Sequence, residues 1–265
     1  MAKDQSGASA NSSYLSPAGP RVLAHRGLAV EAPENTMLAF AKAIAAGAHY
    51  IETDVHASLD GVAVVAHDPS LVRVAGRDLK VEQLTMAELR RIDLGNGQGF
   101  CSLPEALDAF PETRFNIDVK SRGAVSPTVR AIQDIWATDR VLVTSFDEKR
   151  RAATALELPG VASSASAGRF LLALLGAKTG ISPAVRRALN GLVAIQVPEK
   201  ALGLRVTTQR VIHRVHDLGL EMHVWTINEP QRMRHLLDLG VDGIVTDRAD
   251  LALEVVASRA QPGCA

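Results

Sequence analysis

The strongest constraint on the fold is a regular alternation of short apolar runs with segments whose apolar residues recur at helical spacing. Residues 21–25 form a short apolar run that ends in polar residues, as a buried strand does where it meets a loop. Apolar residues from Met37 to Ile44 then recur at helical spacing and stop at Gly47, a residue type that commonly ends a helix. The same order of strand and helix continues along the chain.

This pattern predicts eight strand-then-helix units. Alternating strands and helices imply a parallel sheet, and eight units in about 250 residues is the size of a closed (β/α)8 barrel. An open, doubly wound sheet is the alternative, but no Gly-x-Gly-x-x-Gly motif follows the first strand. The sequence therefore predicts an α/β protein with the (β/α)8 TIM-barrel fold. The expected strands are residues 21–25, 50–55, 114–119, 141–145, 161–163, 192–197, 221–226 and 243–245.

The alternation fails between the second and third of these strands. Asp60-Gly61 is a hairpin-turn signal that leads into an additional apolar run at residues 62–66. The pattern after this run is irregular, with one short helix expected over residues 84–94, where Thr85 and Glu88 have the spacing of a capping box. This irregular stretch is expected to be an insertion in the barrel.

These boundaries predict one TIM-barrel domain over residues 21–258, with a small insertion at about 68–100. Residues 1–20 are rich in Ser, Ala, Gly and Pro and contain no apolar run of signal-peptide length, so we expect a flexible N-terminal tail. Residues 259–265 are expected to be a C-terminal tail.

Composition excludes several classes of protein. The formal net charge of +0 and the aromatic content of 4% argue against a nucleic-acid partner, which usually requires a basic excess or stacking aromatics. Two cysteines, Cys101 and Cys264, are too few for a disulfide framework, which is compatible with the cytoplasmic location that we expect. The longest apolar stretch, Phe170–Leu175, is far short of the ~20 residues of a transmembrane segment. The sequence contains no indication of the oligomeric state.

The second predicted strand carries two carboxylates on one face. Side chains alternate along a strand, so Glu52, Asp54 and His56 project from the same side. Two positions on one face of a strand are ~7 Å apart. Two carboxylates at this separation, with histidines and an arginine nearby in the sequence, indicate a site for a divalent cation and a phosphate group.

The third barrel strand repeats this pattern, because Asn116, Asp118 and Lys120 share a face. Buried carboxylates at close range repel one another unless a cation lies among them or one of them stays protonated. Carboxylate oxygens are preferred ligands of Mg²⁺ and Ca²⁺, whereas no Cys–His cluster has the spacing of a zinc site. The sequence therefore indicates Mg²⁺ or Ca²⁺, with His56 as a less favoured alternative ligand to Asp118.

Polar residues at the carboxyl ends of barrel strands are the candidates for chemistry, because active sites of such barrels lie there. His25 and Arg26 end the first strand, His67 follows the hairpin, and Trp225 ends the seventh barrel strand. The Trp225 side chain is expected either to form the floor of the pocket or to pack in the barrel core. Three further histidines lie on predicted helices and are expected to have surface or packing roles: His213, His216 and His235.

Two residues near other strand ends are weaker candidates. Gln196 lies in the sixth predicted strand and Phe146 directly follows the fourth. Both positions are compatible with a pocket lining, but for Phe146 we expect packing.

Taken in order, these motifs resemble those of the glycerophosphodiester phosphodiesterase family, from about Arg21 to about Val256. The resemblance is carried by Ala24-His25-Arg26-Gly27, Pro33-Glu34-Asn35-Thr36, Glu52-Thr53-Asp54-Val55, His67-Asp68, Asn116-Ile117-Asp118-Val119-Lys120, Val224-Trp225-Thr226-Ile227-Asn228 and Gly240-Val241-Asp242-Gly243-Ile244-Val245-Thr246-Asp247.

The resemblance implies a (β/α)8 barrel with a small inserted segment after the second strand. It also implies hydrolysis of a small glycerophosphodiester to sn-glycerol 3-phosphate and an alcohol, assisted by a divalent cation. Asp118 departs from the family pattern, in which Glu is frequent at this position. The implied metal ligands are Glu52, Asp54 and Asp118, the implied catalytic pair is His25 and His67, and the implied phosphate contacts are Arg26 and Lys120.

Two other functions are compatible with the same motifs. Related barrels cleave lysolipids or sphingolipids as phospholipases D, and the apolar segment Phe170–Leu175 offers a contact for lipid. A catalytically silent barrel that binds a phosphate metabolite is the second alternative, although the intact pair of His25 and His67 argues against it. The sequence leaves open which histidine is the base, and whether the nucleophile is water or a neighbouring substrate hydroxyl.

Overall fold

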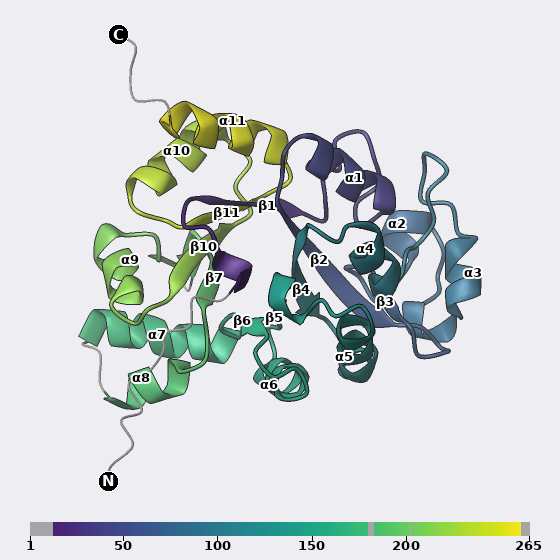
Figure 1. Ribbon diagram of the computed structural model, residues 1–265, viewed down its shortest axis with the longest axis horizontal. Coiled ribbons are helices and arrows are strands. Elements are labelled where there is room, and N and C mark those ends of the chain that lie inside the picture. The colour runs from purple at the N-terminus through teal and green to yellow at the C-terminus, as the bar shows by residue number, and fades with distance from the viewer. Residues whose placement is uncertain (1–12, 180–182, 202, 261–265) are drawn as a thin grey trace.

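Eight parallel strands form a barrel with helices around it (Figure 1). The structure is a computed structural model that describes residues 13–179, 183–201 and 203–260. The barrel strands are β1 (Arg21–His25), β2 (Tyr50–Ala57), β4 (Arg114–Val119), β5 (Val141–Thr144), β6 (Ala162–Ser163), β7 (Ala194–Pro198), β10 (Glu221–Trp225) and β11 (Gly243–Thr246).

The strand order β6-β5-β4-β2-β1-β11-β10-β7 runs around the barrel with parallel neighbours throughout. A parallel bridge between Ser164 and Ala194 joins the two ends of this order, so the barrel is nearly closed. The prediction of a TIM barrel is confirmed, and the eight predicted strands match the observed ones within a few residues.

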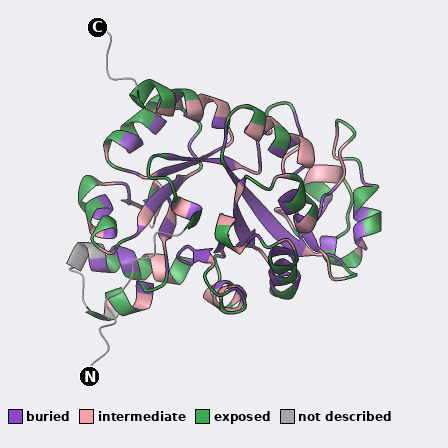
Figure 2. Cartoon of the chain, viewed as in Figure 1, coloured by how far each residue is buried: buried purple, intermediate pink, exposed green. Residues whose placement is uncertain are grey.

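The helices cover the outside of the barrel, with their apolar faces against the strands and their polar faces in water (Figure 2). Local signals define where they begin; the Thr36 side chain, for example, accepts a hydrogen bond from the Ala39 amide. Among the described residues, no helix is both long enough and apolar enough to cross a membrane. The helices are α1 (Met37–Ala45), α4 (Leu103–Ala109), α5 (Val125–Asp134), α6 (Glu148–Leu156), α7 (Ala167–Thr179), α8 (Pro183–Leu189), α9 (Gln209–His216), α10 (Pro230–Asp238) and α11 (Ala249–Ala260).

The irregular stretch after β2 forms a small subdomain with its own apolar cluster, seen at the right of Figure 1. Its first strand, β3 (Ala63–Val65), pairs antiparallel with the end of β2. It continues through α2 (Val72–Ala75), a 3-10 turn (Val81–Gln83) and α3 (Met86–Arg90). The predicted capping box at the start of α3 is present, but the helix ends at Arg90 rather than near residue 94.

Residues 13–20 lie within the predicted N-terminal tail, and part of this segment packs beneath the barrel. Tyr14 is fully buried, with its ring edge-to-face against Tyr50 at a centroid distance of 5.4 Å. Arg21 donates a hydrogen bond to the Pro17 carbonyl and pairs with Glu221 at 2.8 Å. Tyr14 thus closes the amino-terminal end of the barrel, opposite the predicted site. Residues 1–12 and 261–265 of the two predicted tails lie outside the described residues.

We expect Tyr14→Ala to lower the free energy of unfolding by about 3 kcal/mol, because it leaves a cavity in the barrel interior. The Tyr14 hydroxyl is buried and has no hydrogen-bond partner within residues 13–179, 183–201 and 203–260, so Tyr14→Phe is the matched control and should lose no stability. Urea denaturation of the three proteins measures both effects. An equal loss in both variants would show that the hydroxyl, and not the packing of the ring, closes the barrel.

Candidate active site

The loop after β1 is held in an unusual backbone conformation. Arg26 has φ of +58° and Gly27 has φ of +87°, a region that costs a non-glycine residue free energy. A Cβ atom on Gly27 would lie 2.7 Å from the Ala39 carbonyl carbon, so only glycine fits against α1. The Arg26 amide donates to the Glu52 carbonyl at 2.8 Å. This sharp turn places the Arg26 side chain over the mouth of the barrel.

The register between β2 and β4 brings the predicted carboxylates together. Asp54 lies directly opposite Asp118, and Glu52 lies opposite Asn116. The Lys120 ammonium lies between the two aspartates, with its Nζ 2.8 Å from Asp54 Oδ1 and 2.7 Å from Asp118 Oδ2. Lys120 therefore neutralises two buried carboxylates at once.

Asp54 also contacts residues from the loop before α1. The Arg26 Nε lies 3.3 Å from Asp54 Oδ2, and the Asn35 side-chain amide donates to the same oxygen at 3.2 Å. Asn35 adopts φ of +57°, and its side-chain oxygen accepts a hydrogen bond from the Thr53 hydroxyl. Arg26 in turn donates from Nη1 to Glu34 at 3.0 Å.

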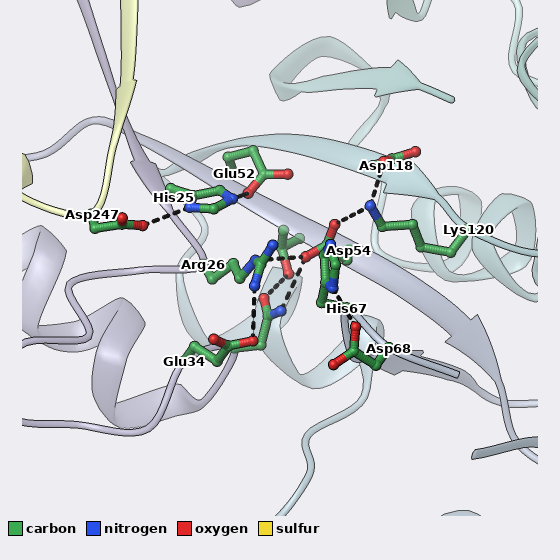
Figure 3. A network of polar contacts seen from close by, with 12 residues as sticks. His25, Arg26, Glu34, Glu52, Asp54, His67, Asp68, Asp118, Lys120 and Asp247 are labelled. Atoms are coloured by element: carbon green, nitrogen blue, oxygen red, sulfur yellow. Dashed lines mark hydrogen bonds and ion pairs between the residues drawn. The ribbon is translucent and has the colours of Figure 1, made fainter. Parts of the chain in front are cut away.

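Each predicted catalytic histidine has a carboxylate on its Nδ1 atom (Figure 3). His25 Nδ1 lies 2.6 Å from Asp247 Oδ1, and His67 Nδ1 lies 2.7 Å from Asp68 Oδ1. An ionised carboxylate only accepts, so each pairing places the Nδ1 proton and leaves Nε2 for other partners. Asp247 is itself fixed by the Asn228 side chain, which donates to it at 2.8 Å.

Burial and mutual repulsion set the protonation of the carboxylates. Burial, together with the charge of Asp54, raises the pKa of Glu52 to about 8. Burial also raises the pKa of Asp118, although Lys120 opposes it. Burial acts in the same direction on Asp54, but the charge and hydrogen bond of Lys120 outweigh it and lower the pKa of that carboxyl. The two aspartates raise the pKa of Lys120, so its ammonium stays charged.

The environments of two histidines also shift their pKa values. Burial lowers the pKa of His25, but the hydrogen bond to Asp247 and the charge of Glu52 outweigh it, and the net shift is upward. Burial lowers the pKa of His56, so this residue is neutral. His56 Nε2 lies 3.2 Å from the His67 carbonyl oxygen, where it fixes the backbone of the candidate catalytic histidine.

A cavity of about 210 Å³ opens at the carboxyl ends of the strands. All eight residues predicted for the site line it: His25, Arg26, Glu52, Asp54, His67, Asp118, Lys120 and Trp225.

The aromatic side of this cavity corrects one prediction. Phe146 lines the cavity with 59% of its surface exposed, so the packing role predicted for it is wrong. Phe146 lies in the loop after β5. Its ring meets the ring of half-buried Trp225 edge-to-face, with 6.1 Å between the ring centroids. Gln196 also lines the cavity.

Several residues of the network were not predicted as site residues, among them Asn35, Asp68, Asp247 and Arg73. The first three lie within the motifs of the resemblance, next to strand ends, and their position there was the available signal. Arg73 lies in the irregular insertion and carries no comparable signal.

The donor set has the chemistry that a hard divalent cation requires. Glu52 Oε2 and Asp118 Oδ1 are buried oxygens that have no hydrogen-bond partner among the described residues, as expected of atoms that serve as ligands. In the described part of the chain, no three His, Cys, Asp or Glu side chains are already gathered as a metal-binding group. The Lys120 ammonium lies between two of the three carboxylates. The residues thus fit a cation by type and by their unpartnered oxygens.

Comparison with known proteins identifies the family. The Glycerophosphoryl diester phosphodiesterase family matches residues 25–251. The chain belongs to this family. The family assignment confirms the resemblance and the enzyme class that the motifs predicted.

Individual relatives agree with this assignment. Probable glycerophosphodiester phosphodiesterase 2 of Mycobacterium tuberculosis is 40% identical over 250 residues, which cover 94% of this chain and 95% of that protein. A lysophospholipase D of Rattus norvegicus is 26% identical, covering 86% of this chain and 83% of that protein. The crystal structure of glycerophosphodiester phosphodiesterase from Agrobacterium tumefaciens has a TM-score of 0.75 at 25% identity, and the match covers 90% of this chain and 99% of that one.

The raised pKa of Glu52 predicts a pH-dependent stability of the metal-free protein. The Glu52 carboxyl has an ordinary pKa of 4.5 and a pKa of about 8 in the folded protein. The stability that comes from its protonated form is therefore fully present below pH 4.5 and is lost as the pH rises through 8. Glu52→Gln stays neutral at every pH. In chelator we expect this variant to lie within about 1 kcal/mol of the parent at pH 5 and to exceed its unfolding free energy by on the order of 5 kcal/mol at pH 9.

Urea denaturation at the two pH values measures this difference, with Glu82→Gln, at an exposed position of the insertion, as the matched control. A parallel decline of parent and Glu52→Gln between pH 5 and pH 9 would contradict the prediction.

Proposed function

We propose that this protein hydrolyses small glycerophosphodiesters to sn-glycerol 3-phosphate and an alcohol. The observation that carries the proposal is the pair of carboxylate-bound histidines, His25 and His67, which line one cavity around a buried cluster of carboxylates and cations. The family assignment supports the reaction class.

The chemistry follows from the charges of the site. Attack at phosphorus adds negative charge to the non-bridging oxygens. Arg26 and Lys120 both line the cavity and would stabilise this charge through charge-assisted hydrogen bonds. One histidine removes a proton from the nucleophile, and the other donates a proton to the leaving alcohol oxygen. Asp247 and Asp68 hold the two imidazoles in the tautomer that leaves Nε2 for these transfers.

A divalent cation completes the proposed site. Glu52, Asp54 and Asp118 would hold it, and when bound it neutralises charge on the phosphoryl oxygens as a Lewis acid. The unpartnered oxygens of Glu52 and Asp118 support this assignment.

A lysophospholipid is the second candidate substrate, favoured by one surface feature. The helix α7 begins at Ala167, which lines the cavity, and then exposes Leu171, Leu172 and Leu175. Such a surface offers an acyl chain an apolar contact beside the cavity. Release of choline from lysophosphatidylcholine, compared with release from glycerophosphocholine, distinguishes the two substrates.

We expect His25→Ala and His67→Ala each to lower kcat on glycerophosphocholine by 10²–10⁴-fold, because general acid–base groups typically contribute this much. The control is His235→Ala, which removes an exposed histidine from α10 and should leave kcat unchanged. Released glycerol 3-phosphate is measured enzymatically. Turnover within tenfold of the parent in both site variants would rule out the acid–base pair.

We also expect turnover to require a divalent cation. Treatment with a chelator should lower turnover at least 100-fold, and added Mg²⁺ or Ca²⁺ should restore it, since the carboxylate cluster otherwise repels the anionic substrate. A panel of glycerophosphodiesters assayed with each cation also measures head-group preference. Full activity in chelator would exclude the metal site.

A further inference from the structure

The insertion after β2 contributes one side chain to the network around the cavity. Arg73, on the short helix α2, donates from Nη1 to Glu34 Oε2 at 2.9 Å and from Nη2 to Glu34 Oε1 at 2.6 Å. Its Nε donates to Asp68 Oδ2. One planar guanidinium thus binds two carboxylates from different segments, a geometry that lysine cannot reproduce.

Each of these carboxylates also holds a residue of the proposed chemistry. Glu34 Oε1 accepts from Arg26 as well as from Arg73, and Asp68 uses its other oxygen for His67 Nδ1. Arg73 therefore stands one contact away from the phosphate-binding arginine and one contact away from a catalytic histidine. It touches neither of them in any contact that the structure shows.

The backbone of Arg73 is fixed by the packing of the insertion. Leu71, two residues before it, is fully buried in the apolar cluster of the insertion, and its amide donates to the Leu79 carbonyl at 2.9 Å. The helix α2 ends at Gly76, whose φ of +63° turns the chain back. A guanidinium anchored in this way holds its carboxylates in one orientation, although half of its own side chain is exposed.

The pKa shifts of Glu34 and Asp68 agree with this arrangement. Burial raises the pKa of Glu34, but hydrogen bonds and charge from Arg73 and Arg26 outweigh it, and the net shift is downward. The pKa of Asp68 is lowered in the same way, against burial, by Arg73 and His67. Both carboxylates are therefore ionised at neutral pH, and Asp68 can only accept from His67.

We propose that Arg73 is a positioning residue, which fixes His67 through Asp68 and Arg26 through Glu34 and so makes the insertion part of the catalytic apparatus. The proposal rests on the proposed function only for its kinetic consequences. Without Arg73, Asp68 and Glu34 lose the ionic partner that sets their orientation. Misplacing a catalytic group by about 1 Å costs up to 10²-fold in rate.

The kinetic test compares three single variants. Arg73→Gln should lower kcat on glycerophosphocholine by about 10- to 100-fold with a smaller rise in KM, and Arg73→Lys should recover only part of the loss. Arg77→Gln removes the same charge from an exposed position of the same insertion and should stay within twofold of the parent. Values of kcat and KM within twofold of the parent for Arg73→Gln would overturn the proposal.

A double-mutant cycle separates positioning from a general structural effect. If Arg73 acts on kcat through Asp68, Arg73→Gln should lower kcat less than threefold further in an Asp68→Asn background. A full, additive loss in that background would overturn the route through Asp68.

A measurement without substrate keeps this test separate from the proposed function. The ¹⁵N chemical shifts of the His67 ring report which nitrogen carries the proton, and the parent and Arg77→Gln should show the Nδ1–H form. Arg73→Gln should show a mixture of tautomers, and an unchanged Nδ1–H form would overturn the proposal whatever the turnover. A parent that turns over no glycerophosphodiester refutes the proposed function, while the tautomer still decides the role of Arg73.

Discussion

The mouth of this barrel is organised by the burial of one charge, the carboxylate of Asp54. Only 1% of Asp54 is exposed, and an uncompensated carboxylate at such a position would cost several kcal/mol. Three groups from two segments compensate it: Lys120 from the loop after β4, and Arg26 and Asn35 from the segment between β1 and α1. The last two adopt positive φ to reach it, so compensation of this charge outweighs backbone strain at both positions.

The sequence predicted the fold and the centre of the site for a simple physical reason. Strand periodicity placed Glu52 and Asp54 on one face, and consecutive strands of a barrel are neighbours, so Asp118 on the next barrel strand was expected nearby. The register that sets Asp118 directly opposite Asp54 is seen only in the structure. Both properties are local or follow from the alternation of elements. The insertion, too, was located by the failure of that alternation, although its helix α3 is shorter than predicted.

What the sequence did not predict depends on contacts between distant segments. Asp247 meets His25 across 222 positions, and no periodicity links them. Arg73 lies in an irregular stretch, where neither strand nor helix spacing says which way a side chain points. Phe146 was expected to pack, but its side chain lines the cavity and is largely exposed. Tyr14 lies in a segment with the composition of a flexible tail, yet its buried ring and hydrogen bonds from Tyr50 and Arg21 to the backbone of this segment hold it against the barrel.

The balance of charge around the cavity argues that the protein alone is an incomplete site for an anionic substrate. Within the described part of the chain, the ion-pair network at the cavity contains six carboxylates and three permanent cations (Arg26, Arg73 and Lys120), so it is negative even when Glu52 is protonated. A phosphodiester would enter against this charge. The proposed divalent cation would add two positive charges among Glu52, Asp54 and Asp118, beside the two buried oxygens for which the described residues offer no hydrogen-bond partner. The same imbalance agrees with the number of partners of each cation, because each of the three binds two carboxylates: Arg26 binds Glu34 and Asp54, Lys120 binds Asp54 and Asp118, and Arg73 binds Glu34 and Asp68.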